Sequence, residues 1–139
     1  MAVAWDDVQR ILKQTKTIAV VGLSDKPDRD SYQIASYLQQ QGYRIIPVNP
    51  RIKEVLGEKA YPSLRDVPDP VDVVDIFRRS EDVPPIVEDA IAIGAKVVWM
   101  QSGIVNEEAA ARAEAGGLAV IMNACMRSAH RALKASGRI

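Results

Sequence analysis

Five short apolar segments recur along the chain, separated by helical patterns and by loops rich in glycine and proline. They predict β-strands at residues 17–21, 44–48, 71–77, 96–100 and 118–122. None of them alternates polar with apolar residues, which is typical of strands buried on both faces of a parallel sheet. The sequence therefore predicts an α/β fold whose strands are joined by right-handed crossovers.

The segments between the strands predict helices at about residues 5–14, 31–41, 83–93 and 126–135, and one more between Asn106 and Gly116. Asn106 is the expected N-cap of that helix, and Pro84 and Pro85 fit only the first turn of another. Residues 49–70 contain four prolines and a glycine, so only a short helical turn is expected there, near residues 63–67. The whole pattern favours a single-domain, Rossmann-like three-layer sandwich with the strand order 3-2-1-4-5.

The composition narrows the functional classes. Eighteen basic residues balance eighteen acidic ones among 139 residues, so general attraction to nucleic acid or to an anionic membrane is not expected. The single cysteine, Cys125, excludes an intramolecular disulfide, and the N-terminal sequence has no apolar core of a signal peptide. We therefore expect one cytoplasmic domain over residues 1–139, without a membrane span.

Ligands of such folds bind at the carboxyl ends of the strands, here expected near the switch point between the first and fourth strands. The first of these ends is Gly22, which permits a tight turn and a close approach of a phosphate to the backbone. Ser24, Lys26 and Arg29 add a hydroxyl and charge, and Ser31 and Tyr32 begin a helix, whose positive end attracts anions. The full GxGxxG pattern is absent, so Gly22 also fits a plain turn after a strand.

The end of the second strand restricts the nucleotide. An NAD site of the usual type has an acidic residue there to bind the ribose hydroxyls, whereas this chain has Asn49, Pro50 and Arg51. These residues suit an adenosine whose ribose carries an extra phosphate, as in coenzyme A or NADP. The alternative is a loop in which a proline simply ends the strand.

The remaining chemistry-bearing residues give weaker signals. Gln101, Ser102 and Gly103 follow a strand and fit either a ligand contact or a turn. His130 is expected on the surface of the last helix, and Cys125 is expected to be a buried free cysteine, with a low-pKa thiol as the alternative. Asp72 and Asp75 are three residues apart in a strand and face opposite sides, so no acid and base pair is expected.

Taken together, the blocks VVGLSDKPDRDSYQIASYL, GYRIIPVNP, VDVVDIFR and AIAIGAKVVWMQSGIVNEEAAARAEAGGLAVIMNAC resemble the small bacterial and archaeal CoA-binding proteins. These are similar to the CoA-binding domain of the succinyl-CoA synthetase alpha chain. The resemblance extends from about residue 3 to about residue 130. The chain departs from the family at Arg51, where a lysine is common, and just before Cys125, where an acidic and a basic residue are common.

The resemblance implies binding of coenzyme A or an acyl-CoA, and it divides the ligand among the candidate residues. The phosphates would lie near Gly22, Ser24, Lys26, Arg29 and Ser31, and the adenosine near Asn49, Pro50 and Arg51. Phe77 and Arg78 would cover the nucleotide, and residues 99–103 would lie near the pantetheine. Ligase activity is not implied, because the synthetase also needs an active-site histidine in a second domain and a partner subunit.

The sequence thus predicts a non-catalytic module for CoA or acyl-CoA, with a homo-oligomer or a protein partner left open and no metal site expected. The main alternative is a small NAD(P)-binding redox protein or sensor. A third hypothesis is an interaction subunit with an apolar patch on its terminal helices. A fourth places the CoA thiol near Cys125 in a mixed disulfide.

Overall fold

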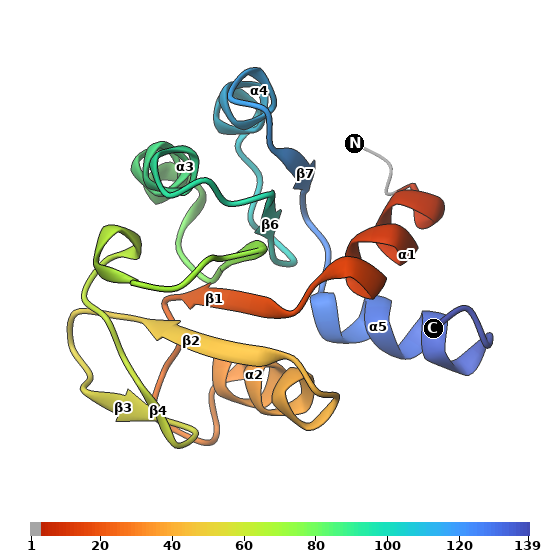
Figure 1. The fold of residues 1–139 in the computed structure, drawn as a ribbon, viewed down its shortest axis with the longest axis horizontal. Coiled ribbons are helices and arrows are strands. Elements are labelled where there is room, and N and C mark those ends of the chain that lie inside the picture. The colour runs from red at the N-terminus through yellow and green to blue at the C-terminus, as the bar shows by residue number, and fades with distance from the viewer. Residues whose placement is uncertain (1–3) are drawn as a thin grey trace.

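Five parallel strands form the central sheet of the protein, which the computed structural model describes over residues 4–139 (Figure 1). They are β1 (Thr17–Val21), β2 (Arg44–Val48), β5 (Val73–Ile76), β6 (Val97–Met100) and β7 (Ala119–Ile121). All five lie in the segments predicted to be strands, and the Rossmann-like α/β class is confirmed. The expected start of the domain core, near residue 3, lies outside the described residues.

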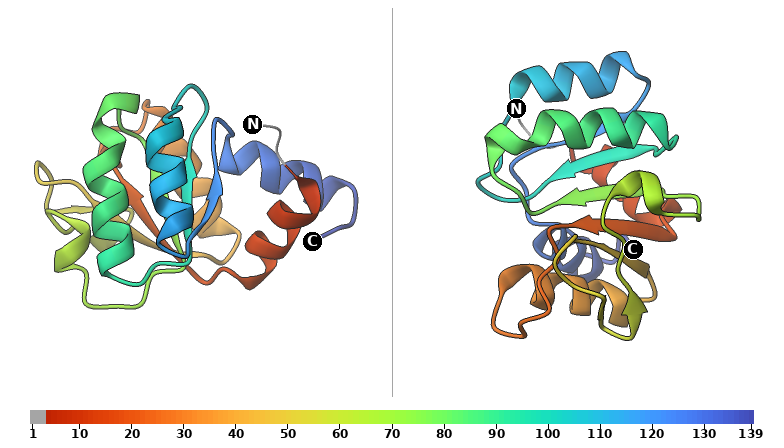
Figure 2. Two further views of the ribbon diagram at one scale, coloured as in Figure 1. Left: turned by 90° about the horizontal axis from the view of Figure 1, so that it is seen from above. Right: turned by 90° about the vertical axis from the view of Figure 1, so that its left-hand side faces the viewer.

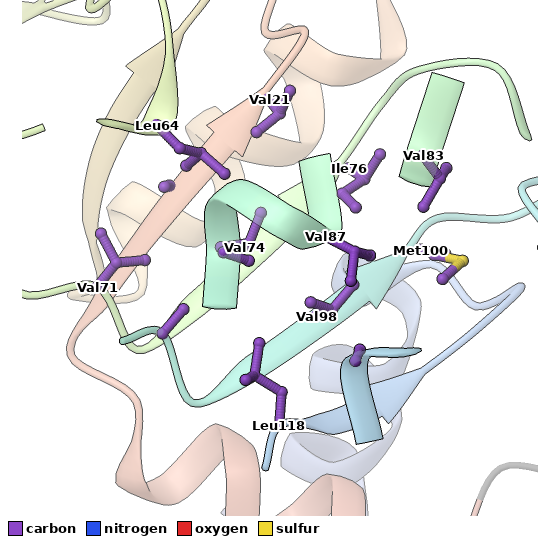
Figure 3. Close-up of a cluster of buried hydrophobic side chains, with 14 of the residues drawn as sticks. Val21, Leu64, Val71, Val74, Ile76, Val83, Val87, Val98, Met100 and Leu118 are labelled. Atoms are coloured by element: carbon purple, nitrogen blue, oxygen red, sulfur yellow. The ribbon is translucent and has the colours of Figure 1, made fainter. Parts of the chain in front are cut away.

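The helices form a layer on each face of the sheet (Figure 2). One face is covered by α1 (Trp5–Gln14), α2 (Asp30–Gln40) and α5 (Met126–Ala135), and the other by α3 (Val83–Ala92) and α4 (Glu107–Ala115). Figure 3 shows the hydrophobic core between the sheet and the helices α3 and α4. Val74 and Val98 of the sheet pack there with Val87 of α3. Full burial of each such side chain stabilises the fold by roughly 1.5–3 kcal/mol.

The strand order differs from the prediction at one place. The observed order is β2-β1-β5-β6-β7, so the third long strand, β5, pairs with β1 and not with β2. Numbered by the long strands alone, this is 2-1-3-4-5 and not 3-2-1-4-5. The direction of winding therefore changes between β1 and β5, and the switch point lies between the first and third long strands.

The connection from β2 to β5 explains this order. It begins with a hairpin of β3 (Glu54–Val55) and β4 (Glu58–Lys59), which the sequence analysis did not predict, and then runs along β2 through a parallel bridge between Val48 and Tyr61. This bridge occupies the edge of β2 where the third strand was expected. The short helix η1 (Leu64–Asp66), which was predicted, then packs into the core under α3, and the chain enters β5 beside β1.

Asp72 fixes the start of β5 beside β1. Its Oδ2 accepts hydrogen bonds from the backbone N–H groups of Lys16 and Thr17, at 2.9 and 3.0 Å. Partial burial would raise the pKa of Asp72, but these bonds and the charge of Lys96 lower it overall. Asp72 and Asp75 have separate partners, since Asp75 accepts its hydrogen bond from Gln101.

The helix ends follow the sequence signals. Asn106 caps α4 by accepting a hydrogen bond from the Ala109 N–H at 2.9 Å, and Pro84 and Pro85 lie in the first turn of α3, after the short helix η2 (Ser80–Asp82). No helix within residues 4–139 is both long enough and apolar enough to cross a membrane.

His130 is buried, contrary to the prediction of a surface position. Its side chain is enclosed between α5, α2 and the start of β2, where the Tyr37 hydroxyl and His130 Nδ1 form a hydrogen bond of 2.8 Å. The rings of Tyr37 and Tyr43 contact it edge-on. The basic residues of α5 hid this position, because His130 follows Met126 and Ala129 on the inward face of the helix.

Candidate functional site

Two adjoining hollows open at the carboxyl ends of β1, β2 and β5. The first, which we name the loop hollow, has a volume of about 710 Å³ and lies between the loop after β1 and the residues after β2. The second, the helix hollow, has a volume of about 640 Å³ and extends from β2 toward η1 and α3. Asn49 and Arg51 line both hollows, so the two form one cleft.

Ten of the fourteen predicted site residues line this cleft. The loop hollow is lined by Gly22, Ser24, Lys26, Arg29, Ser31, Asn49, Arg51 and Phe77, with Asp25, Asp28, Asp30 and Ile52. The helix hollow adds Pro50 and Arg78 to the predicted residues, so ten of them line the cleft in total, and it also contains Val21, Val48, Pro62, Ser63, Leu64, Asp82, Ile86 and Asp89.

Gly22 lines the loop hollow at the end of β1. Its φ is +89°, and a Cβ at this position would lie 2.4 Å from the Phe77 carbonyl oxygen. Its N–H donates to the Val48 carbonyl at 2.9 Å, which joins the ends of β1 and β2. Only glycine combines this backbone conformation with such a close approach of the Phe77 carbonyl group. Gly22 therefore forms the turn after β1 and also lines the cleft.

The loop after Gly22 is held by its own serines. Ser31 Oγ accepts from the Ser24 N–H at 3.0 Å, and Ser24 Oγ accepts from the Lys26 N–H at 3.1 Å. Ser31 lies in the first turn of α2 and is buried. Both hydroxyl groups keep a proton that can be donated to an anion at the positive end of the helix.

Asn49 joins the loops that follow β1 and β2. Its Nδ2 donates to the Leu23 carbonyl at 3.0 Å, and its Oδ1 accepts from the Arg51 N–H at 2.9 Å. The residue found in place of the usual acid thus has a structural role of its own, since it orients Arg51 at the meeting point of the two hollows.

Four cationic side chains of the cleft are free of internal partners. Within residues 4–139, no hydrogen bond or ion pair involves the side chains of Lys26, Arg29, Arg51 or Arg78. An anion could therefore bind them without breaking an existing interaction.

The acidic residues of the cleft were not predicted as part of the site. Asp25, Asp28 and Asp30 alternate with Lys26 and Arg29 along the loop hollow, a pattern that is visible in the sequence DKPDRD. In the helix hollow, Asp82 and Asp89 are paired with Arg79 and Arg65, at 3.2 and 2.6 Å. Arg51 and Arg78 thus supply the unpaired charge of the helix hollow.

Four predicted site residues line neither hollow. Tyr32 is half-buried against the core of the α2 face, and Ser102 and Gly103 are exposed beyond the end of β6. The Gly103 N–H donates to Asn123 Oδ1 at 2.7 Å, which joins the loops after β6 and β7. Gln101 is 3% exposed and points into the core.

Gln101 reaches a buried carboxyl group that the sequence analysis did not select. Its Nε2 donates to Asp75 Oδ1 at 2.6 Å. Burial raises the pKa of Asp75 to about 7, although the hydrogen bond from Gln101 acts in the opposite direction. An acidic residue inside an otherwise apolar strand is the sequence signal that could have identified it.

Comparison with known proteins gives one family. A model described as CoA binding domain matches residues 16–131 of this chain. The chain is 47% identical over 128 residues to the uncharacterized protein YneT of Bacillus subtilis (strain 168), covering 92% of this chain and 95% of that protein. A solved structure of a hypothetical protein from Pyrococcus horikoshii OT3 has a TM-score of 0.92 and 44% identity, covering 96% of this chain and 94% of that one.

Larger proteins contain a similar segment. An ADP-forming acetate–CoA ligase, form II, of Archaeoglobus fulgidus is 34% identical over 107 residues, which is 76% of this chain. The match covers only 16% of the length of the ligase.

Proposed function

Because the chain belongs to the CoA binding domain family, we propose that it binds coenzyme A or an acyl-CoA without catalysing a reaction of its own. The observation that supports this cleft as the site is the position of Arg51, a free guanidinium where the two hollows meet. A CoA nucleotide has phosphates on two sides of its ribose, and a cation between two compartments suits such a ligand.

The pyrophosphate would lie in the loop hollow. Gly22 allows close approach to the backbone, Ser24 and Ser31 have hydroxyl protons to donate, and α2 begins at Asp30. Lys26 and Arg29 supply charge that no internal ion pair consumes within the described chain. In this arrangement the hydroxyl groups of Ser24 and Ser31 contact the phosphates, so the loop can bind them without a GxGxxG sequence.

The adenosine would lie in the helix hollow. Val48, Leu64 and Ile86 offer apolar walls for a base, and Pro50 precedes Arg51 at the entrance. Arg51 and Arg78 can bind a ribose 3'-phosphate, because the acids of this hollow are already paired. Asn49 stands where an NAD site would have an acid, which disfavours a ribose with two free hydroxyls.

The pantetheine would leave the cleft past Phe77 and continue along the carboxyl edge of the sheet. Because β6 neighbours β5, the loop with Ser102 and Gly103 is the next element along this edge. Ser102 and Gly103 keep their predicted association with the pantetheine in this extended sense. Tyr32, at the start of α2, and the buried Gln101 line neither hollow and stay predicted ligand residues only.

We propose that the chain does not catalyse a reaction because it matches only a small part of the ligases. The segment corresponds to their CoA-binding domain and to 12–19% of the lengths of five ADP-forming acetate–CoA ligases or subunits. The activity of the whole ligases is therefore not transferred to this chain. The cytoplasmic location expected from the single cysteine, the single-domain boundary at residues 1–139 and the Cys125 mixed disulfide all stay predictions.

The first experiment is a calorimetric titration with CoA, acetyl-CoA, dephospho-CoA, NADH and NADPH. We expect saturable binding of CoA, and weaker binding of dephospho-CoA because Arg51 and Arg78 lose the 3'-phosphate. Binding of NADPH or NADH in preference to CoA would overturn the proposal and favour the alternative of a redox protein.

A further inference from the structure

Asp75 is a buried carboxyl group that the proposed binding role does not use. It lies in β5 between Val20 of β1 and Trp99 of β6, and its residue is 0% exposed. Gln101 donates to its Oδ1 at 2.6 Å, and its Oδ2 has no hydrogen-bond partner within the described residues. An unpartnered carboxyl oxygen in an apolar core is costly, above all when it is charged.

The hydrogen bonds around Gln101 determine where the proton of Asp75 can be. The Met126 N–H, at the start of α5, faces Gln101 Oε1 at 3.4 Å. A backbone N–H can only donate, so the oxygen of the Gln101 amide faces Met126 and its nitrogen faces Asp75. Oδ1 of Asp75 is therefore an acceptor, and a proton on this carboxyl group must reside on Oδ2.

This chain of contacts leads to the end of the sheet where the ligand is proposed to bind. Asp75 precedes Phe77, which lines the loop hollow, by two residues, or about 6–7 Å along a strand. Through Gln101, Asp75 contacts the first turn of α5 and the loop of Ser102 and Gly103. That loop is held in turn by Asn123.

Both strand neighbours of Asp75 are apolar, since its register partners are Val20 on β1 and Trp99 on β6. The charged residues at the beginnings of the helices on this face are Asp30 on α2, which is exposed, and Arg127 on α5. The Nε of Arg127 is buried and has no hydrogen-bond partner within residues 4–139. Farther along α5, Arg131 lies over the Tyr37 ring and Lys134 binds Gln41. Burial is the main cause of the raised pKa of Asp75.

We propose that Asp75 is a positioning residue of the CoA site that carries a proton on Oδ2 when the ligand is bound, while its Oδ1 holds Gln101 against α5. This inference rests on the proposed function. A neutral Asp75 leaves no negative charge near the pyrophosphate proposed for the loop hollow, whereas an ionised Asp75 would repel it. By linkage, CoA binding should draw a proton onto this group.

The test compares the wild type with Asp75→Asn, an uncharged analogue of the protonated acid, in CoA titrations from about pH 5.5 to about pH 8.5. The two should bind alike at low pH, because Asp75 is then protonated. At high pH the wild type should bind roughly threefold to tenfold more weakly than the variant, for a charge several ångströms away in a partly screened site. Asp72→Asn, the same change three residues earlier, should leave the pH dependence of the wild type unaltered.

Calorimetry in buffers of different ionisation enthalpy measures the number of protons taken up when CoA binds. A purely structural role of Asp75 would not change this number. Near pH 7, the wild type should take up a fraction of a proton more than Asp75→Asn on binding CoA. Equal proton uptake, or parallel pH profiles, would overturn the inference while leaving CoA binding intact. A wild type without saturable CoA binding would instead overturn the proposed function, and the linkage with it.

Carbon-13 NMR of the aspartate carboxyl groups tests the inference in the wild type alone, so it does not require that Asp75→Asn folds. One carboxyl group should titrate near pH 7 in the free protein, and the Gln101 side-chain amide and the Met126 amide should shift with the same midpoint. Addition of CoA should raise that midpoint. A midpoint near the ordinary aspartate value, or one that CoA leaves unchanged, would contradict the inference.

Discussion

Arg51 is the residue on which ligand selectivity is expected to depend. Replacing it with alanine should weaken CoA binding about tenfold to a hundredfold, because a charge-assisted contact to the 3'-phosphate is lost. Binding of dephospho-CoA, measured in the same calorimeter, should change little. Arg10→Ala, which removes an exposed arginine paired with Asp7 on α1, is the matched control and should bind CoA as the wild type does.

If Arg51→Ala lowered the affinity for both ligands equally, Arg51 would not be reading the 3'-phosphate. Arg51→Lys gives an intermediate test, since it keeps the charge but loses the planar fork. Because lysine keeps the positive charge at this place, we expect most of the affinity to be retained.

Gly22 should be the glycine least tolerant of substitution. Gly22→Ala combines a positive φ with a Cβ 2.4 Å from the Phe77 carbonyl, and should lower the free energy of unfolding by about 3–4 kcal/mol. Gly42→Ala is the control, because Gly42 has a φ of +100° but no atom within 4 Å of the added Cβ, and should cost only about 1–2 kcal/mol. Similar losses in denaturant unfolding would show that the close approach of β5 is unimportant.

Site residues could be predicted from the sequence where a strand end or a required backbone conformation limits which residue can occur. Gly22, Asn49 and Arg51 follow strands whose ends were predicted correctly, so their convergence was predictable. Asp75 and His130 were not selected, because their properties come from burial by elements distant in the sequence. The position of Asp75 within an apolar strand was the one local sign of its burial, whereas His130 lies among the basic residues of α5 and had no such sign.

At the scale of elements, the packing of α2 on α5 should make stability depend on pH through His130. Burial and the charge of Lys134 lower the pKa of His130. The folded state therefore binds the proton less readily than the unfolded state, so this part of the stability is present above about pH 6.5 and is lost as the pH falls through the lowered pKa.

Chemical unfolding between about pH 5 and about pH 8 measures this effect. His130→Phe should remove the part of the pH dependence that arises from the imidazole, whereas Tyr37→Phe should retain it, since that variant loses only the hydroxyl that meets Nδ1. An unchanged slope in His130→Phe would assign the pH dependence to another group.

Most elements were predictable because their signals are local. The helix α5 and the strands β1 and β2 occur at the predicted residues, and the cap at Asn106 is confirmed. The strand order was not predictable, because it depends on the bridge between Val48 and Tyr61 and on Asp72, which binds the backbone of Lys16 and Thr17. The hairpin was missed because Leu56 and Gly57 form its turn, with φ values of 55° and 75°, in place of the usual Asn-Gly or Asp-Gly.

For the whole molecule, ligand binding should appear as added stability. CoA at a hundred times its dissociation constant should raise the free energy of unfolding by about 2.7 kcal/mol and the Tm by about 6–10 °C. NADH at the same concentration should leave the Tm unchanged, and the shift produced by CoA should be smaller for Arg51→Ala. An equal shift with NADH would contradict the selectivity inferred for the cleft.

The two hydrogen bonds of Asn49 have a consequence for the time course of binding. Both bonds join protein atoms alone and hold the loops after β1 and β2 together, so the cleft needs no slow assembly step. The association of CoA in a stopped-flow instrument should then follow a single exponential whose rate rises linearly with concentration. Asn49→Ala should introduce a plateau, because closing the two loops would become a separate step that limits the rate.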